Sequence, residues 1–140
     1  MMYVLDTDVV SELRTPERAD PHVAAWAART PLVLHFISSV TLYELEVGIL
    51  LMERRDRAQG AVLRAWMDRQ VLPRFEGRIL PIDTAVARRA AALHVPDPRP
   101  ERDAFIAATA LVHAMTVVTR NVEDYGPTGV EVLNPWELMP

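Results

Sequence analysis

The feature of this sequence that most constrains its fold is the alternation of five short apolar runs with longer segments of helical pattern. The apolar runs cover residues 2–5, 32–37, 78–82, 115–119 and 130–133. Short runs of this kind favour buried strands, and strands that alternate with helices favour a parallel sheet covered on both faces. The sequence therefore predicts an α/β protein, a three-layer α/β/α sandwich around a five-stranded parallel sheet.

Helical patterns fill the segments between the apolar runs. We expect helices over residues 19–28, 39–52, 83–93 and 103–114. A further helix is expected to follow a polar break at 53–60 and to pair with the 39–52 helix as a hairpin. The Pro-rich connector at 96–100 is too short to link two domains, and no segment repeats. The chain is therefore predicted to form a single domain over residues 1–140.

Residue types that are missing from the chain exclude several kinds of chemistry. There is no cysteine, which excludes disulfides, thiolate metal sites and cysteine nucleophiles. All 15 basic residues are Arg, which excludes Schiff-base chemistry and a Walker A lysine. The net charge of −4 predicts no general affinity for nucleic acid, although local Arg clusters or a bound metal can still attract phosphates. With no run of about 18 apolar residues and no basic stretch leading into an apolar one, we expect a cytoplasmic protein without a membrane partner.

Four acidic residues are expected at the carboxyl edge of the predicted sheet. Asp6 ends the first apolar run, Glu44 lies in the first turns of the helix after the second, and Asp124 follows the fourth. Asp103 begins the last crossover helix, whose amino end must lie at the same edge because crossovers between parallel strands are right-handed. Open α/β sheets hold their active sites at this edge, so these four residues are the candidate catalytic and metal-binding residues.

Converging carboxylates need a counter-charge, because their repulsion otherwise raises the pKa of one or more of them until it takes up a proton. Oxygen ligands without nearby His or Cys favour Mg²⁺ or Mn²⁺ as that counter-charge. Such an ion can generate a hydroxide nucleophile and stabilise charge on a phosphoryl group. The pattern therefore predicts metal-dependent hydrolysis of a phosphodiester.

Each of the four acids also has a purely structural interpretation. Asp6 could cap the following helix, and Glu44 could be the third residue of a capping box begun by Thr41. Asp103 could stabilise its helix through a favourable interaction between its negative charge and the helix dipole, and Asp124 could stabilise a turn. Against these alternatives, Glu44 lies in an almost wholly apolar helix and Asp103 opens a face of small residues, which favours carboxylates that point inward.

Two further aspartates lie near the ends of predicted strands. If the strand order is 3-2-1-4-5, Asp83 lies two strands from Asp6, roughly 10 Å at ~4.8 Å per strand, and we interpret it as a helix cap. Asp8 could join the metal shell through water, or it could cap a short helix over residues 9–13. The histidines show no spacing typical of metal ligands and are predicted to be structural or exposed.

Four motifs together make the chain resemble a PIN domain of the VapC-type toxin family, with the pattern of its FitB-like members. They are LDTDVVSE at 5–12, TLYELEVGI at 41–49, DAFIAATA at 103–110 and TRNVEDY at 119–125. The segments GRILP at 77–81 and LNPW at 133–136 add to the match, which extends over nearly the whole chain. One position departs from the pattern, because Asp8 stands where members of this group commonly carry Asn.

The resemblance implies the toxin of a type II toxin–antitoxin system, with the parallel sheet in the order 3-2-1-4-5. Such a toxin is an Mg²⁺- or Mn²⁺-dependent endoribonuclease, usually a homodimer, which a partner antitoxin inhibits and which meets DNA only through that antitoxin. The implied acidic centre consists of Asp6, Glu44, Asp103 and Asp124. Asp6 and Asp103 would be direct metal ligands, and the other two would complete the site or order water. Hydrogen-bonding neighbours would be Thr7, Thr119 and Asn121, while Asp8 stays outside the core set.

Two alternatives to a ribonuclease remain open from the sequence. The spacing of Asp6 and Asp8 matches the nucleophile and acid of haloacid-dehalogenase phosphatases, although the chain is short and has no lysine beside them. A non-catalytic domain that binds antitoxin or RNA is the second alternative, and the presence of all four acids counts against it. The apolar segment at 48–52 and the short 11–13 segment are candidate surfaces for a dimer or an antitoxin.

Overall fold

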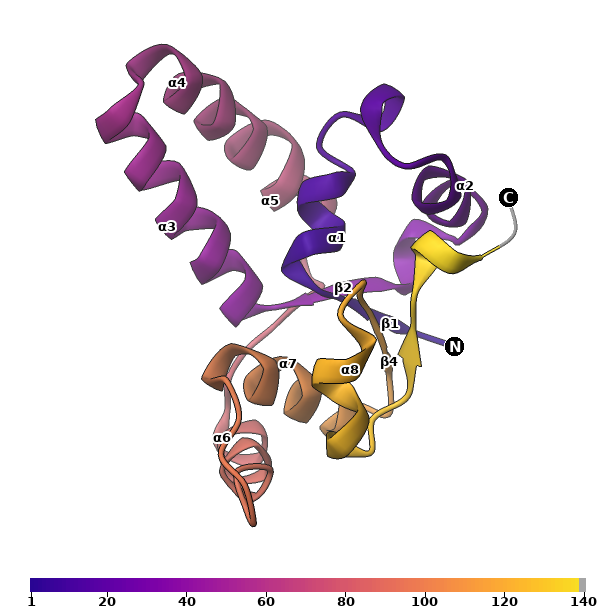
Figure 1. Ribbon diagram of the computed structural model, residues 1–140. Coiled ribbons are helices and arrows are strands. Elements are labelled where there is room, and N and C mark those ends of the chain that lie inside the picture. Colours follow the sequence, from indigo (N-terminus) through magenta and orange to yellow (C-terminus); the bar gives the residue numbers. More distant parts are fainter. Residues whose placement is uncertain (139–140) are drawn as a thin grey trace.

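The computed structural model describes residues 1–138, which are arranged around a parallel sheet (Figure 1). Its strands are β1 (Tyr3–Leu5), β2 (His35–Ser38), β3 (Ile79–Leu80), β4 (Thr116–Val118) and β5 (Val132–Leu133). Their order across the sheet is β3-β2-β1-β4-β5, and every neighbouring pair is parallel. The predicted fold class and strand order are therefore confirmed, and β1 is the central strand.

One predicted strand begins later than its apolar run. Leu32–Leu34 forms a 3-10 turn, closed by a hydrogen bond from the Leu34 backbone N–H to the Pro31 carbonyl, and β2 starts only at His35. Leu32 and Val33 are 43% and 67% exposed. The expected strand over 32–37 was therefore wrong in its first half, because an apolar run specifies a strand only where the sheet buries it.

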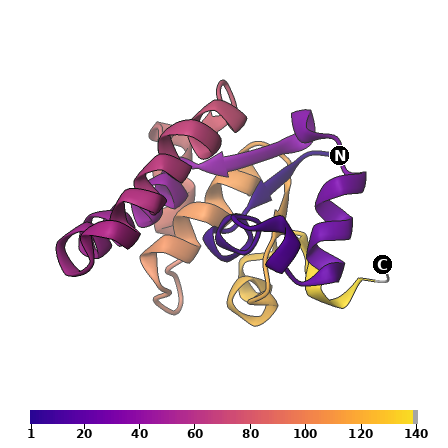
Figure 2. The ribbon, with the colours of Figure 1, turned by 90° about the horizontal axis from the view of Figure 1, so that it is seen from above.

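Helices cover both faces of the sheet (Figures 1 and 2). One face carries α1 (Thr7–Glu12), α2 (Pro21–Arg29), α3 (Ser39–Arg55), α4 (Arg57–Trp66), a π-helical turn (Met67–Val71) and α5 (Leu72–Arg74). The other face carries α6 (Thr84–Ala92), α7 (Glu101–Val112) and α8 (Val122–Tyr125). No helix within residues 1–138 is long and apolar enough to cross a membrane.

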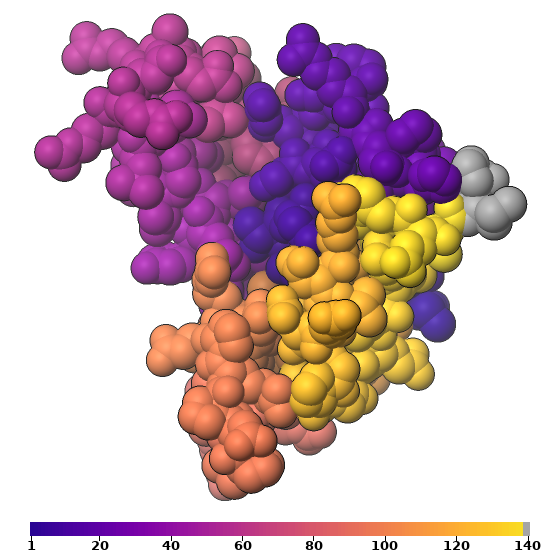
Figure 3. Space-filling model, viewed as in Figure 1, coloured from indigo at the N-terminus to yellow at the C-terminus, as the bar shows by residue number. Residues whose placement is uncertain are grey.

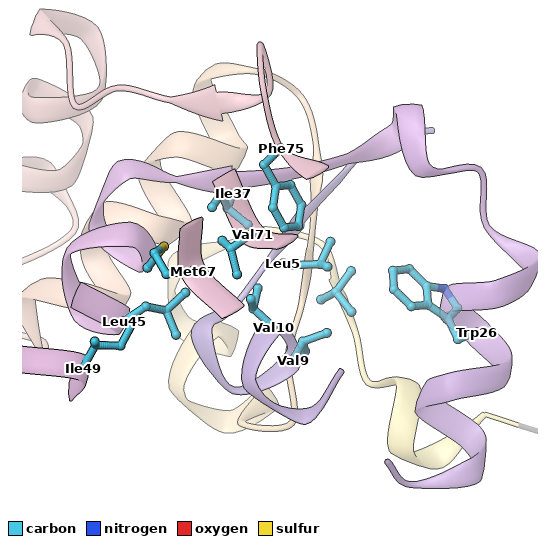
Figure 4. Close-up of a cluster of buried hydrophobic side chains, with 11 residues drawn as sticks. Leu5, Val9, Val10, Trp26, Ile37, Leu45, Ile49, Met67, Val71 and Phe75 are labelled. Atoms are coloured by element: carbon cyan, nitrogen blue, oxygen red, sulfur yellow. The ribbon is translucent and has the colours of Figure 1, made fainter. Parts of the chain in front are cut away.

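Neighbouring residues of β1 contribute to the two hydrophobic cores that pack against the sheet, because side chains alternate across a strand. A third buried cluster lies between α6 and α7. Leu5 points toward the core under α1 and α3, and Val4 points toward the core under α7. Figure 4 shows the first core, in which side chains from strands, helices and the π-helical turn meet. Both cores end at the carboxyl edge of the sheet, so the residues just after β1 and β4 are held by packing from each side.

The helices α3 and α4 form an antiparallel hairpin that projects beyond the sheet (Figures 1 and 3). The polar break predicted at 53–60 is much shorter in the structure, because only Asp56 separates the two helices. The Asp56 side chain caps α4 by accepting a hydrogen bond from the Gln59 backbone N–H at 3.1 Å. A single capping residue is therefore enough to turn the chain, and the polar residues around it stay helical.

Candidate active site

Asp6 lies at the end of the central strand, where it is only 8% exposed and caps α1. Its Oδ1 atom accepts a hydrogen bond from the Thr7 backbone N–H at 2.7 Å. Its Oδ2 atom accepts hydrogen bonds from the Thr119 hydroxyl at 2.8 Å and from the Tyr125 hydroxyl at 3.2 Å. The Thr119 hydroxyl in turn accepts from the Asn121 backbone N–H at 3.0 Å. Thr119 and Tyr125, which both come after β4 in the chain, therefore help to hold the Asp6 carboxylate in one orientation.

Glu44 reaches the same edge from α3. Its Oε1 atom accepts a hydrogen bond from the Thr7 hydroxyl at 2.9 Å, and its Oε2 atom is 2.7 Å from Arg102 Nη1. The capping-box interpretation of Glu44 was wrong, because Ser38 caps α3 and Thr41 lies buried inside the helix with its hydroxyl 3.1 Å from that of Thr7. Thr7 therefore links α1 to α3 through Glu44.

Asp103 lies in the first turn of α7. Burial and the charges of Asp6, Asp124 and Glu44, partly offset by Arg102, together raise the pKa of its carboxyl group from 3.8 to about 6. The four acids named from the sequence therefore interact electrostatically at one site. In the metal-free protein burial and this repulsion therefore keep Asp103 largely protonated below about pH 6.

Asp124 lies on α8, in a short helix and not in the loop expected from the sequence. Its side chain is exposed, whereas the next residue, Tyr125, is fully buried. The ring of Tyr125 packs in the core under α7 and anchors α8 against the site. The position of Asp124 is therefore set by its neighbour in the sequence.

Asp8 lies beside this group without capping a helix, because Asp6 takes the capping position of α1. Its Oδ2 atom accepts a hydrogen bond from the Arg120 backbone N–H at 3.2 Å, which ties α1 to the segment after β4. Its Oδ1 atom is buried and has no hydrogen-bond partner within residues 1–138. Burial and the charge of Asp6 raise the pKa of Asp8 to about 6.

Asp83 stands apart from the acidic site, as the strand order predicts. It follows β3 at the edge of the sheet, two strands from β1, and its carboxylate accepts a hydrogen bond from the Val86 backbone N–H at 3.0 Å as the cap of α6. His35 is also structural, because it is 4% exposed and its ring stacks on Trp26 with centroids 5.1 Å apart.

Sequence reasoning missed two residues of the site. Tyr125 donates to Asp6, and its pKa is raised by its burial and by the charges of Asp6 and Asp103. Arg102 forms the ion pair with Glu44 across 58 positions of sequence. The one available signal for Tyr125 was an aromatic residue that closes a polar segment, which indicates a buried anchor but does not name its partner.

The acids fit a cation that uses few protein ligands. Within residues 1–138 no group of three or more His, Asp and Glu side chains is arranged to hold a metal ion by itself. Mg²⁺ usually keeps several waters and is bound through one or two carboxylates, which suits two aspartates with further acids around them. The all-oxygen donor set, the unpartnered Asp8 Oδ1 atom and the repulsion at Asp103 all favour a positive charge here.

A groove adjoins the acids between α1, α3 and α4. Its volume is about 400 Å³, and it runs from Thr7 and Glu44 past Tyr43 and Val47 to Trp66. In Figure 3 it lies where the indigo surface of α1 meets the purple surface of α3. The exposed lining is mainly apolar and includes Arg14 and Arg102, so the groove suits an amphipathic protein segment.

Comparison with known proteins places this site in a family. The PIN domain family model matches residues 3–123. The VapC ribonuclease Y4jK of Sinorhizobium fredii is 34% identical over 97% of this chain and 99% of its own. Toxin FitB of Neisseria gonorrhoeae is 36% identical over 96% of this chain and 99% of its own.

Solved structures agree with the sequence comparison. The crystal structure of FitAcB from Neisseria gonorrhoeae matches with a TM-score of 0.89 and 34% identity, covering 98% of this chain and all of the other. A toxin–antitoxin complex from Klebsiella pneumoniae matches with a TM-score of 0.66 and 26% identity, covering 99% of this chain and all of the other. These matches favour the nuclease fold over the phosphatase alternative, and the chain is a member of the PIN domain family.

Proposed function

We propose that this protein is the toxin of a toxin–antitoxin pair, an endoribonuclease that hydrolyses RNA phosphodiester bonds with a metal-activated water. The observation that carries this proposal is the meeting of Asp6, Glu44, Asp103 and Asp124 at one edge of the sheet, where burial and the charges of the other three acids raise the pKa of Asp103 to about 6. Relatives of similar length that are named as a VapC ribonuclease and as a toxin support the same activity. We place the activity in the cytoplasm, because RNA is the substrate.

In this proposal Asp6 and Asp103 hold Mg²⁺ or Mn²⁺, and Glu44 and Asp124 accept hydrogen bonds from its waters. When bound, the ion supplies a water that is acidic enough to act as hydroxide and stabilises negative charge on the phosphate. Mg²⁺ is favoured because it usually binds proteins through one or two carboxylates and keeps several coordinated waters. Thr7 keeps Glu44 in place through its hydroxyl group.

Arg102 supplies positive charge at the rim of the acids. Its side chain is 66% exposed, whereas that of its partner Glu44 is 14% exposed, so the guanidinium faces water while the carboxylate faces the site. A guanidinium pairs with phosphate as well as with carboxylate. We propose that Arg102 meets the RNA backbone and thereby offsets the overall negative charge of the chain.

The antitoxin would occupy the groove between α1, α3 and α4. It is a mainly apolar hollow beside the acids, and a segment lying in it would cover Glu44 and deny RNA access to the site. The face of α3 that carries Tyr43 also exposes Leu50 and Leu51, and the three side chains are 66%, 55% and 64% exposed. We propose that this face takes part in antitoxin binding or in a homodimer, because exposed apolar patches mark interfaces.

Substitution of single aspartates tests the proposed activity. We expect Asp6→Asn, and separately Asp103→Asn, to lower RNA cleavage by the purified, antitoxin-free protein at least ~100-fold and to abolish growth arrest. The matched control is Asp83→Asn, because Asn caps a helix about as well as Asp and residue 83 lies away from the site. Circular dichroism checks that each variant is folded. Full cleavage by either active-site variant would overturn the proposal, and a non-catalytic binding domain would show no cleavage in the parent protein.

A further inference from the structure

The buried hydroxyl group of Tyr125 has a role that the acidic centre alone does not explain. Its side chain is fully buried among apolar residues such as Val4 and Ile106, where a Phe ring would pack as well. A buried hydroxyl costs free energy unless it is hydrogen-bonded, and here it donates to Asp6 Oδ2 at 3.2 Å. The effect of the hydroxyl group is therefore its hydrogen bond to Asp6, because packing of the core does not require it.

The hydrogen bonds to Asp6 limit what its carboxylate can offer to another group. A carboxylate accepts at about four lone-pair positions, two on each oxygen. Both positions of Oδ2 are used, one by Thr119 and one by Tyr125, and one position of Oδ1 is used by the Thr7 backbone N–H. The remaining position is on Oδ1.

We propose that the Tyr125 hydroxyl restricts Asp6 to binding a divalent cation through a single oxygen, and thereby favours Mg²⁺ over Ca²⁺ at this site. Ca²⁺ takes more oxygen ligands and often binds a carboxylate through both oxygens, whereas Mg²⁺ requires near-octahedral geometry with one oxygen from each carboxylate. Tyr125 is thus a positioning residue that acts through Asp6. This inference rests on the proposed function, because it concerns the same metal site.

Two other arrangements of the site support the separate role of Tyr125. Thr119 already satisfies one position of Oδ2 and is itself ordered by the Asn121 backbone N–H, so Asp6 would stay buried and bonded without Tyr125. Tyr125 comes from α8, which also carries Asp124. The buried Tyr125 side chain therefore orients Asp6, a proposed ligand, through a hydrogen bond. It also fixes the position of Asp124, its neighbour on α8, through the backbone.

Direct measurement of cation binding tests this inference. Mg²⁺ and Ca²⁺ are each titrated against bound Mn²⁺ on the full, antitoxin-free chain, and free Mn²⁺ is followed by electron paramagnetic resonance. In Tyr125→Phe we expect the affinity for Ca²⁺ relative to Mg²⁺ to rise about tenfold, which is the size of effect that residues behind metal ligands commonly have. Tyr3→Phe is the matched control, because it removes a hydroxyl from β1, the strand that Asp6 follows, and should leave the ratio unchanged.

A second variant covers the case in which Tyr125→Phe does not fold. Thr119→Val removes the other donor to Oδ2 at nearly constant volume, and we expect the same direction of change in the Ca²⁺ to Mg²⁺ ratio. An unchanged ratio in a folded variant overturns the inference and leaves the proposed nuclease intact. Failure of the parent protein to bind any of the three cations overturns the metal-dependent function and this inference together.

Discussion

At the scale of single residues, the site is built from carboxylates whose repulsion is only partly relieved by hydrogen bonds. Asp6 has three donors, whereas Asp103 faces the charges of Asp6, Asp124 and Glu44 and has a pKa raised to about 6. Asp8 is in a similar position, with a pKa of about 6 and one buried oxygen without a partner. In the metal-free protein the raised pKa values of Asp8 and Asp103 mean that ionisation of these two groups lowers the free energy of unfolding.

The raised pKa of Asp103 predicts a stability that depends on pH. The folded-state pKa of about 6 lies above the ordinary value of 3.8, so the favourable contribution is complete below pH ~4 and is lost as the pH rises through 6. Asp103→Asn cannot ionise, and we expect it to stabilise the metal-free protein at pH 8 by about 1 kcal/mol, allowing for solvent screening. Urea unfolding in a chelating buffer at pH 4 and pH 8 measures the difference, which should vanish at the lower pH.

Glu101→Gln is the control for this measurement, because Glu101 lies in the same first turn of α7 and shares any effect of the helix dipole. We expect it to show no comparable gain at pH 8. The helix dipole favours a carboxylate at both positions, so by itself it predicts a loss of stability in each variant. A gain of equal size in both variants would mean that removal of any negative charge, and not repulsion among the four acids, stabilises the protein.

At the scale of secondary-structure elements, the α3–α4 hairpin shows how one glycine and one arginine set the spacing of two helices. Arg64 on α4 pairs with two acids of α3, at 2.6 Å from Glu46 and 3.1 Å from Glu53. Gly60 lies directly against the Glu53 backbone, where an added Cβ would be 2.4 Å from Glu53 Cα. The ion pairs are exposed enough to contribute little, so close packing at Gly60 is the stronger determinant of the hairpin.

Two glycine substitutions separate packing from helix propensity. Gly60→Ala should destabilise the protein by about 1–3 kcal/mol, because the helices must move apart to admit the methyl group. Gly48→Ala in α3 should instead stabilise it by up to about 1 kcal/mol, because nothing lies within 4 Å of the new Cβ. Chemical denaturation of both variants measures the change in the free energy of unfolding, which should be a decrease for Gly60→Ala and an increase for Gly48→Ala. A stabilising Gly60→Ala would show that the hairpin is looser than its backbone contact indicates.

At the scale of the whole molecule, the site joins parts of the chain that are far apart in sequence. Asp6 follows β1, Glu44 lies on α3, Asp103 on α7 and Asp124 on α8. These elements come from both faces of the sheet, as Figure 2 shows, and they meet only in the native fold. A ligand of this site therefore binds the folded chain far better than the unfolded chain, and its binding stabilises the whole fold.

Divalent cation is expected to raise the thermal stability of the protein. At 100 times its dissociation constant Mg²⁺ should add about 2.7 kcal/mol to the free energy of unfolding, visible as a higher Tm by calorimetry. Asp6→Asn should lose this increase, whereas Asp83→Asn should keep it, because Asp83 caps α6 away from the site. The same increase in Asp6→Asn would place the bound cation elsewhere on the chain.

Several expectations failed where the sequence pattern was local and its outcome depended on distant packing. The apolar run at 32–37 becomes a strand only from His35, the polar segment at 53–60 stays helical apart from Asp56, and Thr41 forms no capping box. In each case the residue types fitted two local conformations. The choice between them was made by contacts with other elements.

What the sequence by itself determined is the alternation of strands and helices and, through it, the edge of the sheet that Asp6, Glu44, Asp103 and Asp124 reach. Hydrophobic periodicity and the right-handed crossover are properties of the chain that need no distant partner to be recognised. Only the tertiary structure decided that Tyr125 donates to Asp6 across 119 positions and that Arg102 pairs with Glu44 across 58. Such hydrogen bonds depend on fractions of an ångström between elements, and no local pattern of residues encodes that distance.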